Sequence, residues 1–105
     1  MTYQEFFEQI KEKFMRADVS SVTEHLAFQF NITGEAAGAF YAEVKDGVLY
    51  VEPYEYYDRD AIFTCSAQTL LKLADGKMDP IAAFTLGKLK VDGSIEKALM
   101  VQKFL

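Results

Sequence analysis

The chain has 105 residues, of which 50% are hydrophobic and 26% are charged, and its formal net charge at pH 7 is −5. This length predicts a single domain over residues 1–105, and the balance of apolar and charged residues excludes a disordered chain. An acidic chain is a poor match for nucleic acid, so we expect no nucleic-acid partner. The single Cys excludes an internal disulfide framework and favours a reducing setting, so we expect a cytoplasmic protein.

The charge is unevenly distributed along the sequence. Residues 1–65 carry twelve acidic and five basic side chains, a sum of −7, whereas residues 66–105 carry four acidic and six basic ones, a sum of +2. The basic third can meet an anionic surface, so an anionic membrane stays open as a partner. The simpler interpretation is that these lysines are ordinary solvated side chains.

The N-terminal segment carries the pattern of an amphipathic helix. Thr2 and Glu5 have the spacing of a capping box, in which each residue satisfies a free backbone N–H of the other. An apolar residue then recurs every fourth position, which places one apolar stripe on the helix. The pattern predicts a helix of about 14 residues that ends near Ala17. The stripe consists of Phe6, Ile10 and Phe14.

Strict alternation predicts strands in the middle of the chain. Residues 26–32 place apolar side chains on one face and polar ones on the other, which is typical of a half-buried strand. Asp46-Gly47 is a two-residue hairpin turn between two further alternating segments. The turn pairs Val44 with Leu49, and a slip by one residue would mix the apolar and polar faces. The full predicted register pairs Lys45 with Val48, Val44 with Leu49, Glu43 with Tyr50 and Ala42 with Val51.

The second half alternates between strands and capped helices. Residues 61–65 predict a short strand, and Ser66 then caps a helix that Gly76 ends. This helix is expected to carry Ala67, Leu70, Leu71 and Ala74 on one face. Asp79-Pro80 start a short helix that Gly87 stops, residues 88–91 alternate as a strand, and Asp92-Gly93 turn the chain. Ser94 caps a final helix. The order of elements predicts an α+β fold, with a five-stranded, mainly antiparallel sheet and helices packed on one face.

The Gly-Lys pairs at 76–77 and 87–88 do not match a Walker A loop. That loop needs a hydroxyl residue after the lysine and a helix beyond it, but Leu89 follows Lys88 and a strand is predicted there. The first pair follows a helix, whose C-terminal dipole end is negative and repels phosphate. We therefore expect no phosphate-binding loop.

No residue cluster indicates an enzyme. His25 lies on the polar side of its strand and Cys65 on the apolar side of another, so an exposed, inert histidine is favoured over a catalytic pair. One His and one Cys make no zinc site. Asp58 and Asp60 are interpreted as solvated charge, although carboxylates alone leave acid–base chemistry open. We expect a non-enzymatic protein with no metal and no cofactor.

Apolar surface is over-supplied in the last third. The helix over 80–86 is apolar on every side, so each side needs a cover. In the final helix, Met100 and Phe104 fall among charged residues and would be exposed. They indicate an interaction site, or else a frayed chain end.

The segment "GKMDPIAAFTLGKLKVDG" at 76–93 resembles the signature of the sterol carrier protein 2 family, which is similar to G-K-x-x-P-x-x-A-F-x-x-G-K-L-K-[IV]-x-G. The resemblance covers residues 60–105 closely and the earlier strands loosely. It implies a sheet and helices that enclose an apolar tunnel, and non-catalytic binding of fatty acids, acyl-CoA, sterols or other lipids. The lack of a peroxisomal tail implies a stand-alone prokaryotic member.

These observations together predict a carrier for a small hydrophobic ligand. Plain core packing stays open for each residue singly, and the alternative is an accessory or dimerising module that presents a hydrophobic intermediate to an enzyme or membrane. A homodimer stays open as well. The residues expected to line or gate the cavity are Phe30, Phe63, Ile81, Phe84, Leu86, Leu99, Met100 and Phe104.

Overall fold

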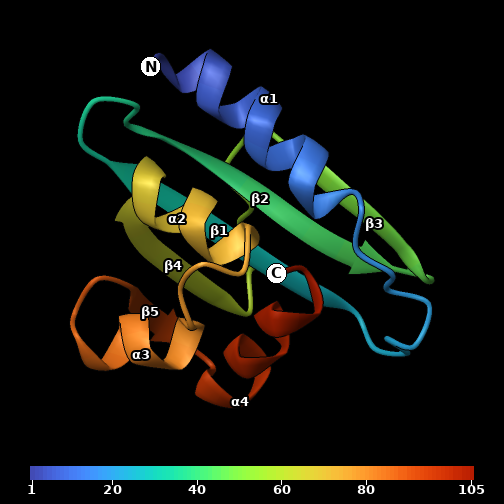
Figure 1. Cartoon of the computed structure of the whole chain (residues 1–105). Coiled ribbons are helices and arrows are strands. Elements are labelled where there is room, and N and C mark those ends of the chain that lie inside the picture. Colours follow the sequence, from blue (N-terminus) through green and yellow to red (C-terminus); the bar gives the residue numbers. More distant parts are fainter.

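The computed structural model describes all residues from 1 to 105 and contains one five-stranded sheet with helices (Figure 1). The strand order is β3-β2-β1-β4-β5. Elements in chain order are α1 (Tyr3–Phe14), β1 (Leu26–Thr33), β2 (Gly38–Lys45), β3 (Val48–Glu52), β4 (Ala61–Ser66), α2 (Ala67–Ala74), α3 (Pro80–Thr85), β5 (Lys90–Gly93), α4 (Ile95–Ala98) and the 3-10 helix η1 (Leu99–Lys103).

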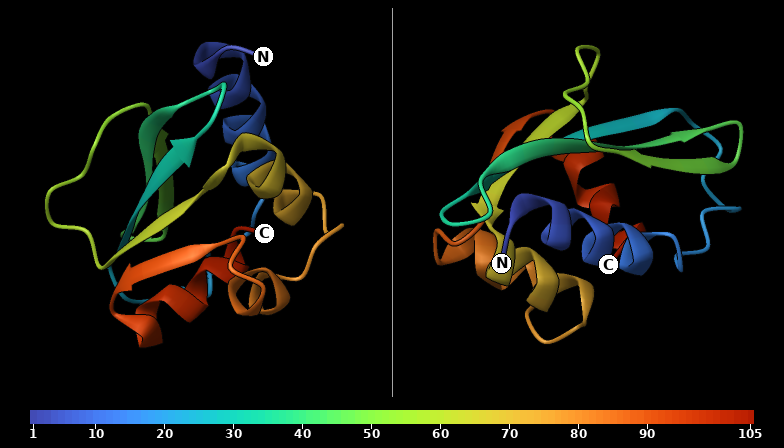
Figure 2. Two further views of the ribbon diagram at one scale, coloured as in Figure 1. Left: turned by 90° about the vertical axis from the view of Figure 1, so that its left-hand side faces the viewer. Right: turned by 90° about the horizontal axis from the view of Figure 1, so that it is seen from above.

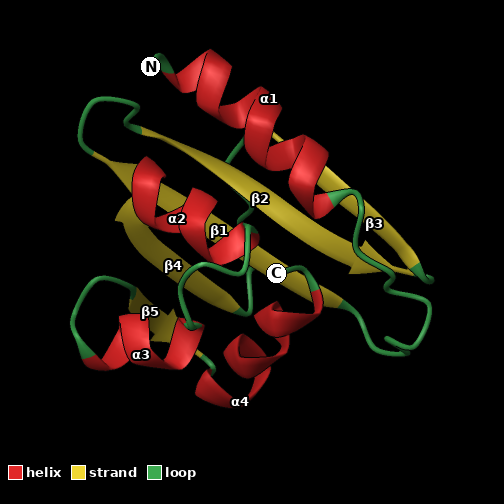
Figure 3. Ribbon diagram, in the orientation of Figure 1, coloured by secondary structure: helices red, strands yellow, loops and turns green.

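The sheet is mixed, because β1 pairs in parallel with β4 while the other three pairs of neighbours are antiparallel. Seen from above, all helices lie beneath the sheet and the β3–β4 connection rises on the other side (Figure 2). Coloured by secondary structure, the same arrangement shows the helices gathered over one face of the strands (Figure 3). The predicted α+β architecture, with helices on one face of a mainly antiparallel sheet, is confirmed.

The β2–β3 hairpin has the predicted register at every pair, including Val44 with Leu49 and Ala42 with Val51. Asp46 and Gly47 both have positive φ, at 53° and 75°, as a tight turn of this kind requires. The turn and the alternation of side chains agree, so the local sequence is sufficient to fix this part of the sheet.

The core lies between the helices and the sheet and is built largely from phenylalanine rings. Phe30 is the central ring. It stacks on Phe40, with ring centroids 4.8 Å apart, and on Phe63, with centroids 5.2 Å apart. All three rings are buried, and the predicted α1 stripe of Phe6, Ile10 and Phe14 packs into the same core. Stacked and edge-on rings add to the free energy that their burial contributes.

All four predicted N-caps are present. The side-chain oxygens of Thr2, Ser66, Asp79 and Ser94 each accept a hydrogen bond from the backbone N–H three residues on. In α2 the buried face consists of Ala67, Leu70 and Leu73. Leu71 and Ala74, predicted on the same face, are partly buried and pack against the core. Helix α1 ends at Phe14 rather than near Ala17, because the chain continues in tighter turns with bonds to the third residue back.

Strand β1 is more deeply buried than its alternation predicts. Ala27 and Gln29, on its polar side, are buried as well as its apolar residues. The β3–β4 connection covers this side, since the backbone N–H of Tyr56 donates to Gln29 Oε1 at 3.1 Å. The strand occupies the centre of the sheet, which the alternation alone does not indicate.

Two predicted boundaries in the C-terminal segment are wrong. The last strand runs over Lys90–Gly93 instead of 88–91, so Asp92 and Gly93 belong to the strand rather than to a turn. The final helix changes from α to 3-10 geometry at Leu99. A 3-10 helix has three residues per turn, so residues three apart share a face. Phe104 is therefore buried with Ala98 and Val101, whereas Leu99 is exposed; the prediction of an exposed Phe104 is wrong.

Candidate functional site

An apolar pocket of about 250 Å³ lies between α3, the α4–η1 segment and the strands β4 and β5. Nine of its eleven lining residues are hydrophobic. Phe63 and Val91 contribute the sheet side, where they are register partners on adjacent strands. The lining consists of Phe63, Pro80, Ile81, Phe84, Leu89, Val91, Ile95, Ala98, Leu99, Val101 and Gln102.

Large apolar side chains at the rim are left partly in water. Ile81, Phe84, Ile95 and Leu99 are each between 51% and 55% exposed. In α3 only Ala83 is buried, although the helix is apolar on every side. The uncovered apolar sides of α3 and α4 therefore meet across an open pocket, which is where the over-supply of apolar surface in the sequence is concentrated.

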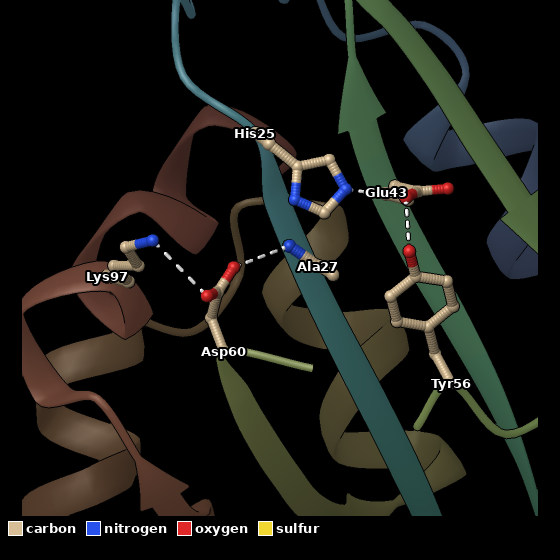
Figure 4. Close-up of polar contacts among 6 residues, drawn as sticks. All are labelled: His25, Ala27, Glu43, Tyr56, Asp60 and Lys97. Carbon is tan, nitrogen blue, oxygen red and sulfur yellow. Dashed lines mark hydrogen bonds and ion pairs between the residues drawn. The ribbon is translucent and has the colours of Figure 1, made fainter. Parts of the chain in front are cut away.

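Helix α4 is held against the sheet by Asp60 (Figure 4). The Asp60 carboxylate accepts a hydrogen bond from the Ala27 N–H at 2.9 Å and pairs with Lys97 Nζ at 3.2 Å. The Asp60 carbonyl also accepts from the Ser94 N–H at 2.9 Å. One residue at the start of β4 therefore ties β1 to the first turn of the helix that carries Ile95 and Leu99.

A separate polar cluster, of His25, Glu43 and Tyr56, lies on the face of the sheet that points away from the helices (Figure 4). Glu43 Oε2 lies 2.6 Å from His25 Nε2 and accepts a hydrogen bond from the Tyr56 hydroxyl at 2.6 Å. Burial raises the pKa of Glu43, but the two hydrogen bonds outweigh it and the net pKa is lower than usual. The hydrogen bond to Glu43, with some burial, raises the pKa of Tyr56 to about 12. These contacts fasten the β3–β4 connection to β2.

The Cys65 thiol is buried, and burial raises its pKa to about 12. Such a thiol stays protonated near neutral pH and is a poor nucleophile. Cys65 pairs with Ile32 near the end of β1, whereas His25 precedes the start of that strand, so the structure keeps the two residues apart. No group of three or more His, Cys, Asp or Glu side chains is placed to hold a metal ion.

A family model described as "SCP-2 sterol transfer family" matches residues 4–105. The chain belongs to this family. Its membership confirms the resemblance seen in the 76–93 segment; origin in a stand-alone prokaryotic protein remains a prediction. No helix in this SCP-2 family chain combines the length and apolar character needed to cross a membrane.

Similar proteins place this family domain in several settings. Hydroxysteroid dehydrogenase-like protein 2 from Bos taurus is 28% identical over 105 residues, and the match covers 97% of this chain but 24% of that protein. The matches cover between 15% and 24% of the length of the curated relatives of this name. The SCP-2 domain therefore also occurs within a longer protein whose name refers to an enzyme.

Solved structures confirm the fold at low sequence identity. A sec-alkylsulfatase, Pisa1 from Pseudomonas sp., superimposes with a TM-score of 0.74 at 21% identity, covering 86% of this chain and 14% of that one. Palmitated SCP2L2 from Aedes aegypti superimposes with a TM-score of 0.70 at 18% identity, covering 98% and 93%. The second protein is of the same size class as this chain and is a palmitated form.

Of the eight residues predicted to line or gate the cavity, the structure brings four together around the pocket and leaves four elsewhere. Phe63, Ile81, Phe84 and Leu99 line the pocket. Phe30 and Phe104 are buried in the aromatic core, Met100 packs against that core, and Leu86 is 71% exposed outside the lining.

Sequence reasoning missed Ile95 and Leu89 as lining residues. A regular α-helix over the final segment would place Ile95 on its core face, but the segment changes to 3-10 geometry at Leu99 and Ile95 lies half-exposed at the rim. Leu89 and Val91 had a usable signal, since they alternate with Lys88 and Lys90 and so had to face the apolar side. The roles of all these residues in binding remain predictions.

Proposed function

We propose that this chain binds the hydrocarbon part of a lipid or fatty acyl compound in the pocket between α3, α4 and the sheet, without catalysing a reaction. The observation that carries the proposal is the pair of uncovered apolar helix sides, with Phe84 and Leu99 half-exposed across an almost wholly apolar lining. Membership of the SCP-2 sterol transfer family and a palmitated structural relative support it.

The mechanism is sequestration. Each methylene moved from water into an apolar site contributes about 0.8 kcal/mol, so a chain of about ten carbons offsets much of the entropic cost of association. The pocket of about 250 Å³ is slightly smaller than ligand sites usually are, and it is open at its rim. We therefore propose that one part of the ligand is enclosed while the rest stays near the rim formed by Ile81, Phe84 and Leu99.

A charged substitution at the rim tests this proposal. Phe84→Asp places a carboxylate against the hydrocarbon chain, so we expect displacement of a fluorescent fatty acid by palmitate to weaken about tenfold or more, since a buried unpaired charge is costly. Val48→Asp is the matched control, because Val48 is 49% exposed, close to the 51% of Phe84, and lies on the far hairpin. Native mass spectrometry after gentle purification should show bound lipid in the wild type and the control only.

Equal affinity in the two variants would contradict a site at this pocket. No displacement by any of palmitate, decanoate or cholesterol at micromolar protein, together with no co-purified lipid, would contradict the proposed function as a whole.

A second candidate function is an accessory module that presents a hydrophobic intermediate to an enzyme or a membrane. The rim of four half-exposed large side chains favours it, because such patches often mark interaction sites. A concentration-dependent dimer in light scattering would support a twin subunit, and salt-sensitive flotation with anionic vesicles would support a membrane. This second function would be contradicted if the chain stays monomeric and does not float with vesicles, and if Phe84→Asp changes neither result.

A further inference from the structure

A second hollow, of about 450 Å³, lies where β4 runs into α2 and the turn after α3 leads to β5. In Figure 1 the start of α2 and the loop between α3 and β5 lie near the end of β4, and α4 lies farther away. Unlike the apolar pocket, the hollow is mostly polar, with two hydrophobic residues among its eleven. We call it the lysine hollow, because Lys72, Lys88 and Lys90 line it.

The charges of the lysine hollow are uncompensated. Lys72, Lys88 and Lys90 make no ion pair, and no Asp or Glu lines the hollow. The chain has 16 acidic residues and a net charge of −5, and Lys11, Lys13, Arg16 and Lys97 each pair with one of them. Three unpaired cations on one polar concavity in an acidic chain form a local positive field that attracts anions.

Hydroxyl groups supply hydrogen-bond donors beside these cations. Thr64 is the register partner of Lys90, and Thr33 and Ser66 are partners on the neighbouring strands β1 and β4. The hydroxyls of Thr33 and Thr64 make no hydrogen bond within the chain, and both residues line the hollow. Ser66 begins the capped N-terminus of α2, whose positive dipole end faces the same region.

The turn after α3 fixes the backbone at Lys88. Gly87 has a φ of 76°, and the N–H groups of Gly87 and Lys88 donate to the carbonyls of Phe84 and Ala83. The segment that follows then alternates sides. Lys88 and Lys90 line the lysine hollow, while Leu89 and Val91 line the apolar pocket. The segment 88–91, which ends in β5, therefore separates a polar site from an apolar one, and each can be altered without touching the other.

From these observations we propose that the lysine hollow binds a phosphate-bearing anion. Lysine binds phosphate as a point charge, and a phosphate dianion carries more negative charge and more acceptor oxygens than a carboxylate, so it is the better match for the three lysines of the hollow. The arrangement is unlike a Walker A loop, since Lys88 and Leu89 lead into the strand β5, which begins at Lys90, rather than into a helix. The phosphate can belong to a soluble compound or to a phospholipid headgroup.

Titration with inorganic pyrophosphate, followed by NMR of the backbone amides at 50 mM salt, tests the proposal. We expect saturable shifts at Thr69, Gly87 and Lys88 with a midpoint below about 1 mM, and unchanged amides in the β2–β3 hairpin. Lys72→Gln/Lys88→Gln/Lys90→Gln should weaken binding about tenfold or more, because three charge-assisted contacts are removed.

The matched control is Lys45→Gln/Lys77→Gln/Lys103→Gln, which lowers the net charge by the same three units at lysines outside the hollow. We expect less than about a threefold loss of affinity in this variant, from general charge alone. Circular dichroism should show both triple variants folded, since all six lysines are exposed.

A second arm uses vesicles of phosphatidylcholine with one-fifth phosphatidic acid. Flotation that depends on the three hollow lysines, together with weak pyrophosphate binding, assigns the phosphate to a lipid headgroup. Tight pyrophosphate binding without such flotation assigns it to a soluble compound. Equal losses in the two triple variants, or no saturable binding to either probe, would overturn the proposal. Phe84→Asp should leave pyrophosphate binding unchanged, so failure here and failure of the lipid-binding proposal are distinguishable.

Discussion

At Gly93 the last strand passes close to the backbone of Asp60 and Ala61. Its φ is 103°, and a Cβ built there would lie 2.6 Å from the carbonyl oxygen of Asp60. We expect Gly93→Ala to lower the free energy of unfolding by about 3 kcal/mol, since it combines backbone strain with a clash against backbone atoms. Urea denaturation at equilibrium measures the loss.

Gly34→Ala is the control for this substitution. Gly34 has a φ of 87° but no atom within 4 Å of the added Cβ. Gly34→Ala should lower the free energy of unfolding by about 1–2 kcal/mol, from backbone strain alone. Losses of the same size at both positions would mean that the close approach to Asp60 contributes nothing.

Glu43 gives the stability of the chain a defined dependence on pH. Its pKa in the folded chain is below the ordinary value of 4.5, because hydrogen bonds from Tyr56 and His25 outweigh the effect of burial. A lowered folded pKa stabilises the chain above the ordinary pKa, and this stabilisation is lost as pH falls through the folded value. Glu43→Gln should therefore cost about 1 kcal/mol at pH 7 and progressively less below about pH 4.

Urea denaturation of the wild type and Glu43→Gln at several pH values measures this difference. Glu55→Gln serves as the control, since Glu55 is exposed and makes no hydrogen bond. A difference between wild type and Glu43→Gln that stays constant from pH 7 to pH 3 would show that the carboxylate charge is not responsible.

At the scale of the element, substitutions in the C-terminal segment can distinguish a regular α-helix from the observed 3-10 helix, because the two geometries bury different residues. Phe104 contacts Phe14 and Phe28, with ring centroids 6.0 and 5.8 Å away, whereas Leu99 is 55% exposed. We expect Phe104→Ala to cost about 3 kcal/mol or more and Leu99→Ala less than about 1 kcal/mol in free energy of unfolding. The opposite order in chemical denaturation would indicate a regular α-helix with Leu99 in the core.

The elements whose boundaries were predictable are those fixed by contacts between near neighbours in the chain. Ser66 and Asp79 cap helices through hydrogen bonds to backbone groups three residues away, so their sequence signals are complete. The change of helix type at Leu99 has no such signal. It depends on where Phe104 finds space among Phe14 and Phe28, which come from distant parts of the chain.

The same division holds for the whole molecule. The hairpin register followed from the sequence, but the parallel pairing of β1 with β4 joins segments that no local pattern relates. The order of the predicted elements indicates a five-stranded, mainly antiparallel sheet, but neither it nor the resemblance of residues 76–93 to the family indicates which pair of strands is parallel.

Four of the eight residues predicted for the site line the pocket, and the sequence signal for two of them is local. An all-apolar helix at 80–86 pointed to Ile81 and Phe84, because such a helix needs cover wherever it packs. The lysine hollow was not foreseeable. Lys72 and Lys90 come from α2 and β5, and only the folded arrangement brings them beside Thr64.

Pairing β4 with β1 closes a much longer loop of chain than pairing β2 with β3, so it costs more conformational entropy. The β2–β3 strands are joined by a two-residue turn, whereas the contact of Ala27 with Asp60 closes a loop of 33 residues. Closure cost rises by about 0.6 kcal/mol per doubling of loop length, so the parallel pair begins roughly 2 kcal/mol behind the hairpin. The rings of Phe28, Phe30 and Phe63 lie along this seam, where their burial offsets that deficit.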